Sequence, residues 1–263
     1  MVKRRPFEFV FMDVGNVLVS DDPAAAFLYR KLYEYTGGEK RWTPQQFFAA
    51  RLEHVKNGGD LWSFIRSQVK AEEFDAWRQK TRSELFTSWE KYSPPIPGMG
   101  EVVQKLARFY RLGLIANQPT QIREVLTHRG LWHFFEVTAI SEELGVGKPD
   151  PAIFLWAIER AKVDPKNALM IGDRIDNDIV PARRLGMSTL WLSLSFEQRG
   201  WVPQDEFENA YAESVKQRCV SSVAPGSPEE KPDFEARSPQ EVLDILCPGI
   251  EEELTPQTSA YES

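Results

Sequence analysis

Residues Phe7 to Gly15 read FEFVFMDVG, an apolar run rich in phenylalanine and valine that breaks at a glycine. Such a run predicts a buried strand that ends in a turn. Residues from about 22 to 92 contain no convincing strand, and their pattern instead predicts four helices. The helix-starting signals are Asp22-Pro23 and Thr43-Pro44, and the helix-ending signals are Gly37-Gly38 and Gly58-Gly59.

After Pro94 the pattern becomes a strict alternation of helices and strands. We expect helices around 102–110, 121–128, 152–161 and 179–185, each followed by a strand, at 112–116, 136–140, 168–171 and 189–192. A last short strand and helix are expected at 234–237 and 239–246. This alternation predicts an α/β fold, with a Rossmann-like, three-layer parallel sheet core and an inserted all-helical cap.

The expected boundaries follow from these changes of pattern. The core comprises 1–20 and 93–247, and the cap comprises 21–92. Residues 196–231 do not follow the alternation and are expected to form an irregular insertion within the core. Residues 248–263 are expected to be a disordered acidic tail.

The net charge of −7 is unevenly distributed. From Pro228 to Ser263 there are ten acids and two bases, so this stretch carries −8 and the rest carries +1. A near-neutral body argues against nucleic-acid binding but not against a small anionic substrate. No apolar run approaches the roughly 20 residues of a membrane helix, which argues against a membrane protein. Two cysteines, Cys219 and Cys247, give no disulfide framework, so we expect a cytoplasmic protein.

Polar residues follow the predicted strands at the edge where ligands bind in open parallel sheets. Asp13 follows the first strand, Asn117 the second and Asp173 the fourth, while Lys148 and Asp178 lie in the intervening or following loops. Carboxylates brought close together repel each other unless a hard cation binds them. A divalent cation, a lysine and a free carboxylate suit phosphoryl transfer.

Four stretches resemble the motifs of the haloacid dehalogenase-like (HAD) hydrolase superfamily, in that family's order. They are FMDVGNVL at 11–18, IAN at 115–117, GKPDP at 147–151 and GDRIDND at 172–178. The resemblance implies that Asp13 is a nucleophile that forms an aspartyl-phosphate. It implies Mg²⁺ held by Asp13, Asp173, Asp178 and the carbonyl of Gly15. It also implies phosphate binding around Asn117, Lys148, Ala116 and Asn16, with Asn117 and Lys148 also serving catalysis.

Two positions depart from the family pattern. Gly15 stands where most of the family's phosphatases have a second Asp as general acid and base, and Ala116 stands where Ser or Thr is usual. Loss of that acid predicts slow turnover of alkyl phosphates, whose leaving groups need a proton. Glu53, His54 or Asp60 in the cap could supply one. Asp21 and Asp22 are interpreted as caps of the next helix.

The resemblance favours a Mg²⁺-dependent phosphohydrolase that acts on a small phosphorylated metabolite. One alternative is a 2-haloacid dehalogenase, which needs no second acid but typically lacks the acids of the fourth motif. Asp173 and Asp178 are both present here, which favours phosphate chemistry. Another alternative is a catalytically weakened protein that uses the fold to bind a protein partner. The sequence leaves a homodimer undecided.

Overall fold

Six parallel strands form the central sheet of the protein, whose computed structural model describes residues 7–218 and 225–248. Their order is β3-β2-β1-β4-β5-β6, and each neighbouring pair runs parallel. The strands are β1 (Phe9–Met12), β2 (Arg111–Ala116), β3 (Phe135–Ile140), β4 (Ala168–Gly172), β5 (Ser188–Leu192) and β6 (Phe234–Ala236). The first strand of the chain therefore lies in the middle of the sheet, beside β4.

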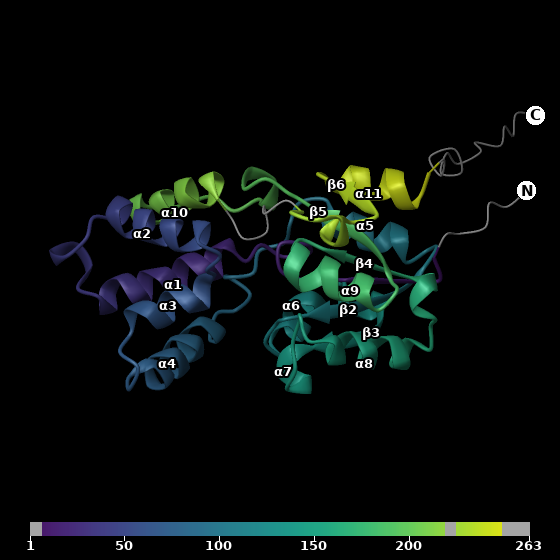
Figure 1. Cartoon of the computed structure of the whole chain (residues 1–263), viewed down its shortest axis with the longest axis horizontal. Helices are drawn as coiled ribbons and strands as arrows, with labels where there is room; N and C mark the ends of the chain where they lie inside the picture. The colour runs from purple at the N-terminus through teal and green to yellow at the C-terminus, as the bar shows by residue number, and fades with distance from the viewer. Residues whose placement is uncertain (1–6, 219–224, 249–263) are drawn as a thin grey trace, which may run out of the picture.

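Helices cover both faces of the sheet (Figure 1). One face packs against α5 (Met99–Leu106), α6 (Ile122–His128) and α11 (Pro239–Leu246), and the other against α8 (Pro151–Ala161) and α9 (Val180–Arg184). Because successive side chains of a strand point to opposite faces, Val10 and Met12 enter one core, and Phe9 and Phe11 the other. This three-layer arrangement confirms the predicted fold class.

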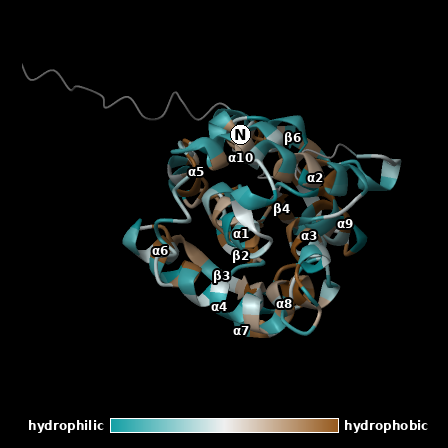
Figure 2. Ribbon diagram, turned by 90° about the vertical axis from the view of Figure 1, so that its left-hand side faces the viewer, coloured by the Kyte–Doolittle hydropathy of each residue, from teal (hydrophilic) through white to brown (hydrophobic). Residues whose placement is uncertain are grey.

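The helical module follows β1 and lies beside the core (Figure 1). Its helices are α1 (Asp22–Tyr35), α2 (Pro44–Lys56), α3 (Leu61–Gln68) and α4 (Phe74–Phe86). Capping boxes begin α2 at Thr43 and α3 at Asp60. In an end-on view α1 lies in the middle of this module, among the other helices (Figure 2). Its Tyr29 packs against buried aromatic rings of α2 and α3.

The segment between β5 and β6 contains a helix that the sequence interpretation missed. α10 (Glu206–Gln217) begins after Asp205, whose side chain accepts the N–H of Glu208, and it packs against α2. The side chains it buries are Phe207, Ala210, Tyr211, Ala212, Ser214 and Val215. The expected irregular insertion in the core is therefore wrong for residues 206–217, which form a helix on the cap. Of the expected acidic tail 248–263, only residue 248 is among the described residues.

Two linkers connect cap and core side by side. The N–H of Ser20 donates to the carbonyl of Pro94 (2.9 Å), and the N–H of Ile96 donates to that of Leu18 (3.0 Å). The chain therefore leaves and re-enters the core at one place, just beyond the end of β1. Within the described residues, no helix combines the length and apolar character that would let it cross a membrane.

A buried ion pair fastens the start of α1 to the segment that follows β5. The Oδ2 of Asp22 lies 3.2 Å from Nε of Arg199, and both side chains are less than 5% exposed. The hydroxyl of Tyr211, on α10, donates to Oδ1 of the same carboxylate at 2.8 Å. One buried acid thus joins the cap, the core and α10.

We expect Arg199→Met to destabilise the fold strongly, because it leaves the Asp22 carboxylate buried without its cation. Removing one partner of a buried pair costs about 3–5 kcal/mol. The measurement is the free energy of unfolding in urea. The control is Arg123→Met, which removes the exposed partner of Glu143 and should cost no more than about 1 kcal/mol. Equal losses in the two variants would contradict the structural role given to Asp22 and Arg199.

Candidate active site

Three carboxylates meet where β1 and β4 end. Asp13 follows β1 and Asp173 follows β4, and the parallel register of these strands brings their ends together. Asp178 joins them from a π-helical turn, Ile175–Ile179. One oxygen of each carboxylate lies within 4.8 Å of the other two, and all three residues are buried. The structure thus brings together the two acids that the sequence placed at strand ends, Asp13 and Asp173, with Asp178 from the segment that follows β4.

Lys148 bridges two of these acids. Its Nζ lies 2.7 Å from Oδ1 of Asp13 and 2.6 Å from Oδ1 of Asp178, and its side chain is 1% exposed. Asn117, directly after β2, holds the lysine's backbone: its Oδ1 accepts the N–H of Lys148 and its Nδ2 donates to the carbonyl. The second hydrogen of Nδ2 is not used in these bonds, so the expected phosphate contact of Asn117 stays a prediction.

A single lysine does not neutralise three buried acids. Burial raises the pKa of Asp13 to about 6, although Lys148 opposes this rise. Burial, together with the charges of Asp178 and Asp13, raises the pKa of Asp173 well above its ordinary value. A hard divalent cation with oxygen ligands relieves such repulsion. The three converging carboxylate oxygens therefore fit Mg²⁺, and Asp13, Asp173 and Asp178 are the residues that could hold it.

The remaining predicted site residues surround this cluster. Ala116 ends β2 and is buried within the apolar core. Asn16 has a left-handed backbone (φ 51°), its Nδ2 lies 3.3 Å from Oδ2 of Asp173, and its Oδ1 accepts the N–H of Asp21. A Cβ on Gly15 would lie 2.1 Å from Oδ2 of Asp21, so a side chain at position 15 would require the Asp21 carboxylate to move.

Asp21 and Asp22 do not cap α1 with their side chains, which corrects the sequence-based expectation. Asp21 occupies the N-cap position but has helical rather than extended dihedrals, and its side chain makes no capping bond. Asp22 instead pairs with Arg199, whereas Asp21 lines a cavity together with Gln118. Burial, with the charges of Asp13 and Asp22, raises the pKa of Asp21 to about 7.

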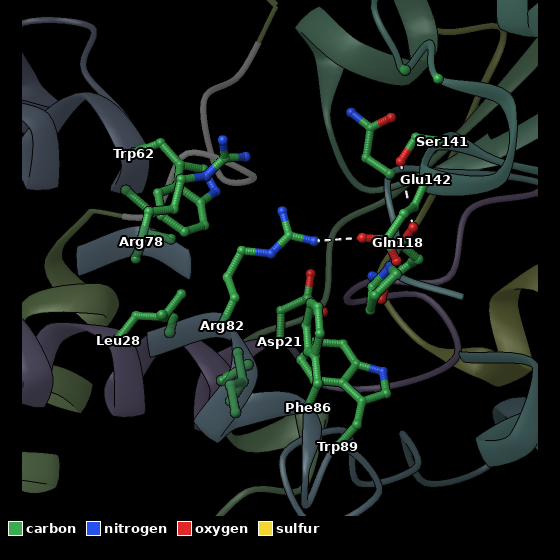
Figure 3. A pocket seen from close by; sticks show the side chains of 18 of the residues that line it. Asp21, Leu28, Trp62, Arg78, Arg82, Phe86, Trp89, Gln118, Ser141 and Glu142 are labelled. Carbon is green, nitrogen blue, oxygen red and sulfur yellow. Dashed lines mark hydrogen bonds and ion pairs between the residues drawn. The ribbon is translucent and has the colours of Figure 1, made fainter. Parts of the chain in front are cut away.

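A cavity of about 580 Å³ lies between the cap and the core (Figure 3). Its cap side is mostly apolar with two arginines, and its core side is mostly polar. The cap contributes Leu28, Trp62, Arg78, Arg82, Phe86 and Trp89, and the core contributes Asn117, Gln118, Ser141, Glu142 and Gly147. Arg82 on α4 pairs with Glu142 on α7 (Ser141–Leu144) at 2.9 Å. This ion pair connects the two sides of the cavity.

The cap acids and histidine proposed as replacements for the missing acid are bound elsewhere. Asp60 accepts the N–H of Ser63 at the start of α3, and Nε2 of His54 lies 2.8 Å from the hydroxyl of the same serine. Glu53 pairs with Lys56 on the surface. In the described structure none of the three candidates lines the cavity.

A parallel sheet with clustered acids at its central strand ends, beneath an inserted helical cap, defines a capped α/β hydrolase. Within that class the chain belongs to the haloacid dehalogenase-like hydrolase family, whose model matches residues 7–186. The match includes the acid cluster, Lys148 and the whole inserted cap up to its return into the core.

Individual relatives share parts of the chain. A glyceraldehyde 3-phosphate phosphatase of Methanopyrus kandleri is 31% identical over 157 residues, which are 59% of this chain and 58% of that protein. A phosphoserine phosphatase of Thermus thermophilus is 33% identical over 141 residues, 53% of this chain and 50% of that protein. The chain thus spans about half the length of these curated relatives.

Solved structures share the fold over nearly the whole chain. The magnesium-bound HAD-hydrolase YfnB of Bacillus subtilis superimposes with a TM-score of 0.62 and 21% identity. The superposition covers 93% of this chain and 100% of YfnB. At this level of identity the likeness establishes the fold of the core and cap together.

We expect Mg²⁺ to stabilise the protein by binding to the acid cluster. At about 100 times its dissociation constant, a ligand adds about 2.7 kcal/mol to the free energy of unfolding. The measurement is the melting temperature as a function of Mg²⁺ concentration. Asp173→Asn removes a charged ligand and should abolish most of the rise.

The matched control for that experiment is Asp176→Asn. Asp176 lies on the same π-helical turn, but its carboxylate pairs with Arg174 and does not belong to the cluster. Its replacement should leave the rise intact. A rise that persists unchanged in Asp173→Asn would place the ion outside the cluster.

Proposed function

We propose that the protein is a Mg²⁺-dependent phosphohydrolase that acts on a small phosphorylated metabolite. The observation that carries the proposal is the buried cluster of Asp13, Asp173 and Asp178, with Lys148, at the sheet edge beneath the cap. Two sequence relatives named as phosphatases of small phosphorylated compounds support this choice. The magnesium-bound state of YfnB supports the choice of cation.

Asp13 is the proposed nucleophile, forming an aspartyl-phosphate. The N–H of Val14 and the Nζ of Lys148 both bind its Oδ1, at 2.7 Å each. These two contacts fix the orientation of the carboxylate. Within the described residues they leave Oδ2 without a protein partner, and that oxygen is the one we assign to attack on phosphorus.

Charge balance sets the roles of the other residues. Mg²⁺ would be held by Asp13, Asp173, Asp178 and the carbonyl of Gly15. When bound, the ion supplies positive charge that offsets the negative charge of the transferring phosphoryl group. Lys148 adds a further positive charge at the same place. We assign Asn117 to positioning the lysine and, through its remaining amide hydrogen, to phosphate binding. Asn16 braces Asp173.

The cavity accommodates the rest of the substrate. Its volume of about 580 Å³ lies within the range of small-molecule sites, roughly 300–1,000 Å³. Trp62 and Phe86 offer apolar surface, and Arg78 and Arg82 offer positive charge. These walls suit a small anionic ester, and they support a substrate of metabolite size over a macromolecule.

The two alternative functions predict different requirements for the acid cluster and different activities. A 2-haloacid dehalogenase has no need of the buried Asp173 and Asp178, which make up two thirds of the acid cluster here. A weakened protein-binding relative would hold the cation without hydrolysing any ester. Assays with 4-nitrophenyl phosphate, a panel of sugar phosphates and 2-chloropropionate, each with and without Mg²⁺, separate the three functions.

We expect Asp13→Asn to abolish Mg²⁺-dependent phosphate release, because an amide oxygen cannot form the acyl-phosphate. Removing a nucleophile lowers kcat on the order of 10⁴-fold or more. The measurement is steady-state hydrolysis of 4-nitrophenyl phosphate. The control is Asp75→Asn on the exposed side of α4, which should keep wild-type turnover. Wild-type rates in Asp13→Asn would remove Asp13 from this role.

A further inference from the structure

The space that a side chain at position 15 would need is already filled by another carboxylate. An ideal Cβ on Gly15 would lie 2.1 Å from Oδ2, 2.9 Å from Cγ and 3.1 Å from Oδ1 of Asp21. These are the three nearest atoms to that Cβ, and all belong to Asp21. Glycine at position 15 and aspartate at position 21 are therefore sterically complementary. A carboxylate is present beside the nucleophile, although it comes from six residues further along the chain.

The backbone around Asp21 fixes this placement. Its N–H donates to Oδ1 of Asn16 at 3.2 Å, and Asn16 in turn contacts Asp173. The carboxylate makes no capping bond to α1 and is free to face the cavity, whose wall it forms together with Gln118 (Figure 3). Asp21 thus lines the cavity and also packs against Gly15, two residues after the proposed nucleophile.

We propose that Asp21 is the general acid and base of the reaction, in place of the second acid that Gly15 cannot supply. This inference rests on the proposed phosphohydrolase function. As Asp13 bonds to phosphorus and the ester P–O bond breaks, the leaving oxygen takes the proton of the Asp21 carboxyl group and departs as an alcohol. A water molecule then attacks the aspartyl-phosphate, gives one proton to the Asp21 carboxylate and releases inorganic phosphate, which restores Asp13 and Asp21.

Other acids of the cavity are less suited to this task. Glu142 is the other carboxylate in its wall, but its two oxygens are held by Arg82 and by the N–H of Thr120. Both oxygens of Glu142 therefore already have protein donors. The control is Glu143→Gln, an acid-to-amide change on the same helix α7 at a residue that pairs with Arg123 and does not line the cavity.

The test compares three esters of similar shape: 4-nitrophenyl phosphate, phenyl phosphate and benzyl phosphate. The nitrophenolate leaves without a proton, whereas the benzyl alcohol needs one. We expect Asp21→Asn to slow the first step with benzyl phosphate by about 10²–10⁴-fold. With 4-nitrophenyl phosphate it should release about one equivalent of nitrophenol per enzyme at near the wild-type rate, followed by slow turnover as the aspartyl-phosphate accumulates. Glu143→Gln should show neither effect.

A rescue variant adds an independent measurement. Gly15→Asp alone should clash with Asp21 and impair all three esters. Asp21→Ala removes the three atoms that occupy the space, so the double variant Gly15→Asp/Asp21→Ala should turn over benzyl phosphate at least 10-fold faster than Asp21→Ala. Circular dichroism and melting temperature with Mg²⁺ identify variants that fail to fold.

The outcomes separate the inference from the function beneath it. Equal slowing of all three esters in Asp21→Asn, with no burst of nitrophenol, would mean that Asp21 acts only structurally and would overturn the inference. Retention of benzyl phosphate turnover within about 3-fold would overturn it as well. If the wild-type protein hydrolyses none of the three esters and Asp13→Asn behaves identically, the proposed function fails and takes the inference with it.

Discussion

The structure depends on the electrostatic balance at the carboxyl ends of β1 and β4. Asp13, Asp173 and Asp178 are buried within a few ångströms of one another, and Lys148 contributes a single compensating charge. Apolar strands on both sides hold the ends together, so the acids cannot move apart to relieve their repulsion. The remaining negative charge makes this edge receptive to a cation and, through that cation, to an anion. Fold and chemistry are thus coupled at a single point.

The entrance of the cap belongs to the same electrostatic unit. Asp21 and Asp22 are the two residues at which the chain enters α1, yet the Asp21 carboxylate lines the cavity and the Asp22 carboxylate pairs with a buried arginine. Any change in how α1 sits on the core therefore moves a charged group within the cavity. Gly15 makes this arrangement sterically feasible, because it leaves space on the core side that the cap residue fills.

The sequence predicts the buried strands and the polar residues that follow them. It does not predict features that depend on the direction in which a side chain points. The buried strands FVFM and ALMIG and the residues that follow them could be predicted, because parallel central strands are apolar throughout. Helix α10 could not be recognised from its large apolar residues alone, because Ala210 and Ser214 complete its buried face. Asp21 was obscured by the Asp-Pro pair that follows it, a pattern typical of helix starts. Asp21 fails to cap α1 because its backbone has helical dihedrals, which no residue pattern specifies.

Helix α10 gives the cap a second attachment to the core. The chain leaves the core after β5, lays Phe207 and Tyr211 against the aromatic rings of α1 and α2, and returns to form β6. The cap is therefore connected to the core at two separate places, the linkers on either side of it and helix α10. Removing residues 21–92 as an independent module would also remove the contacts of α10, and would expose Phe207 and Tyr211 of the remaining chain to water.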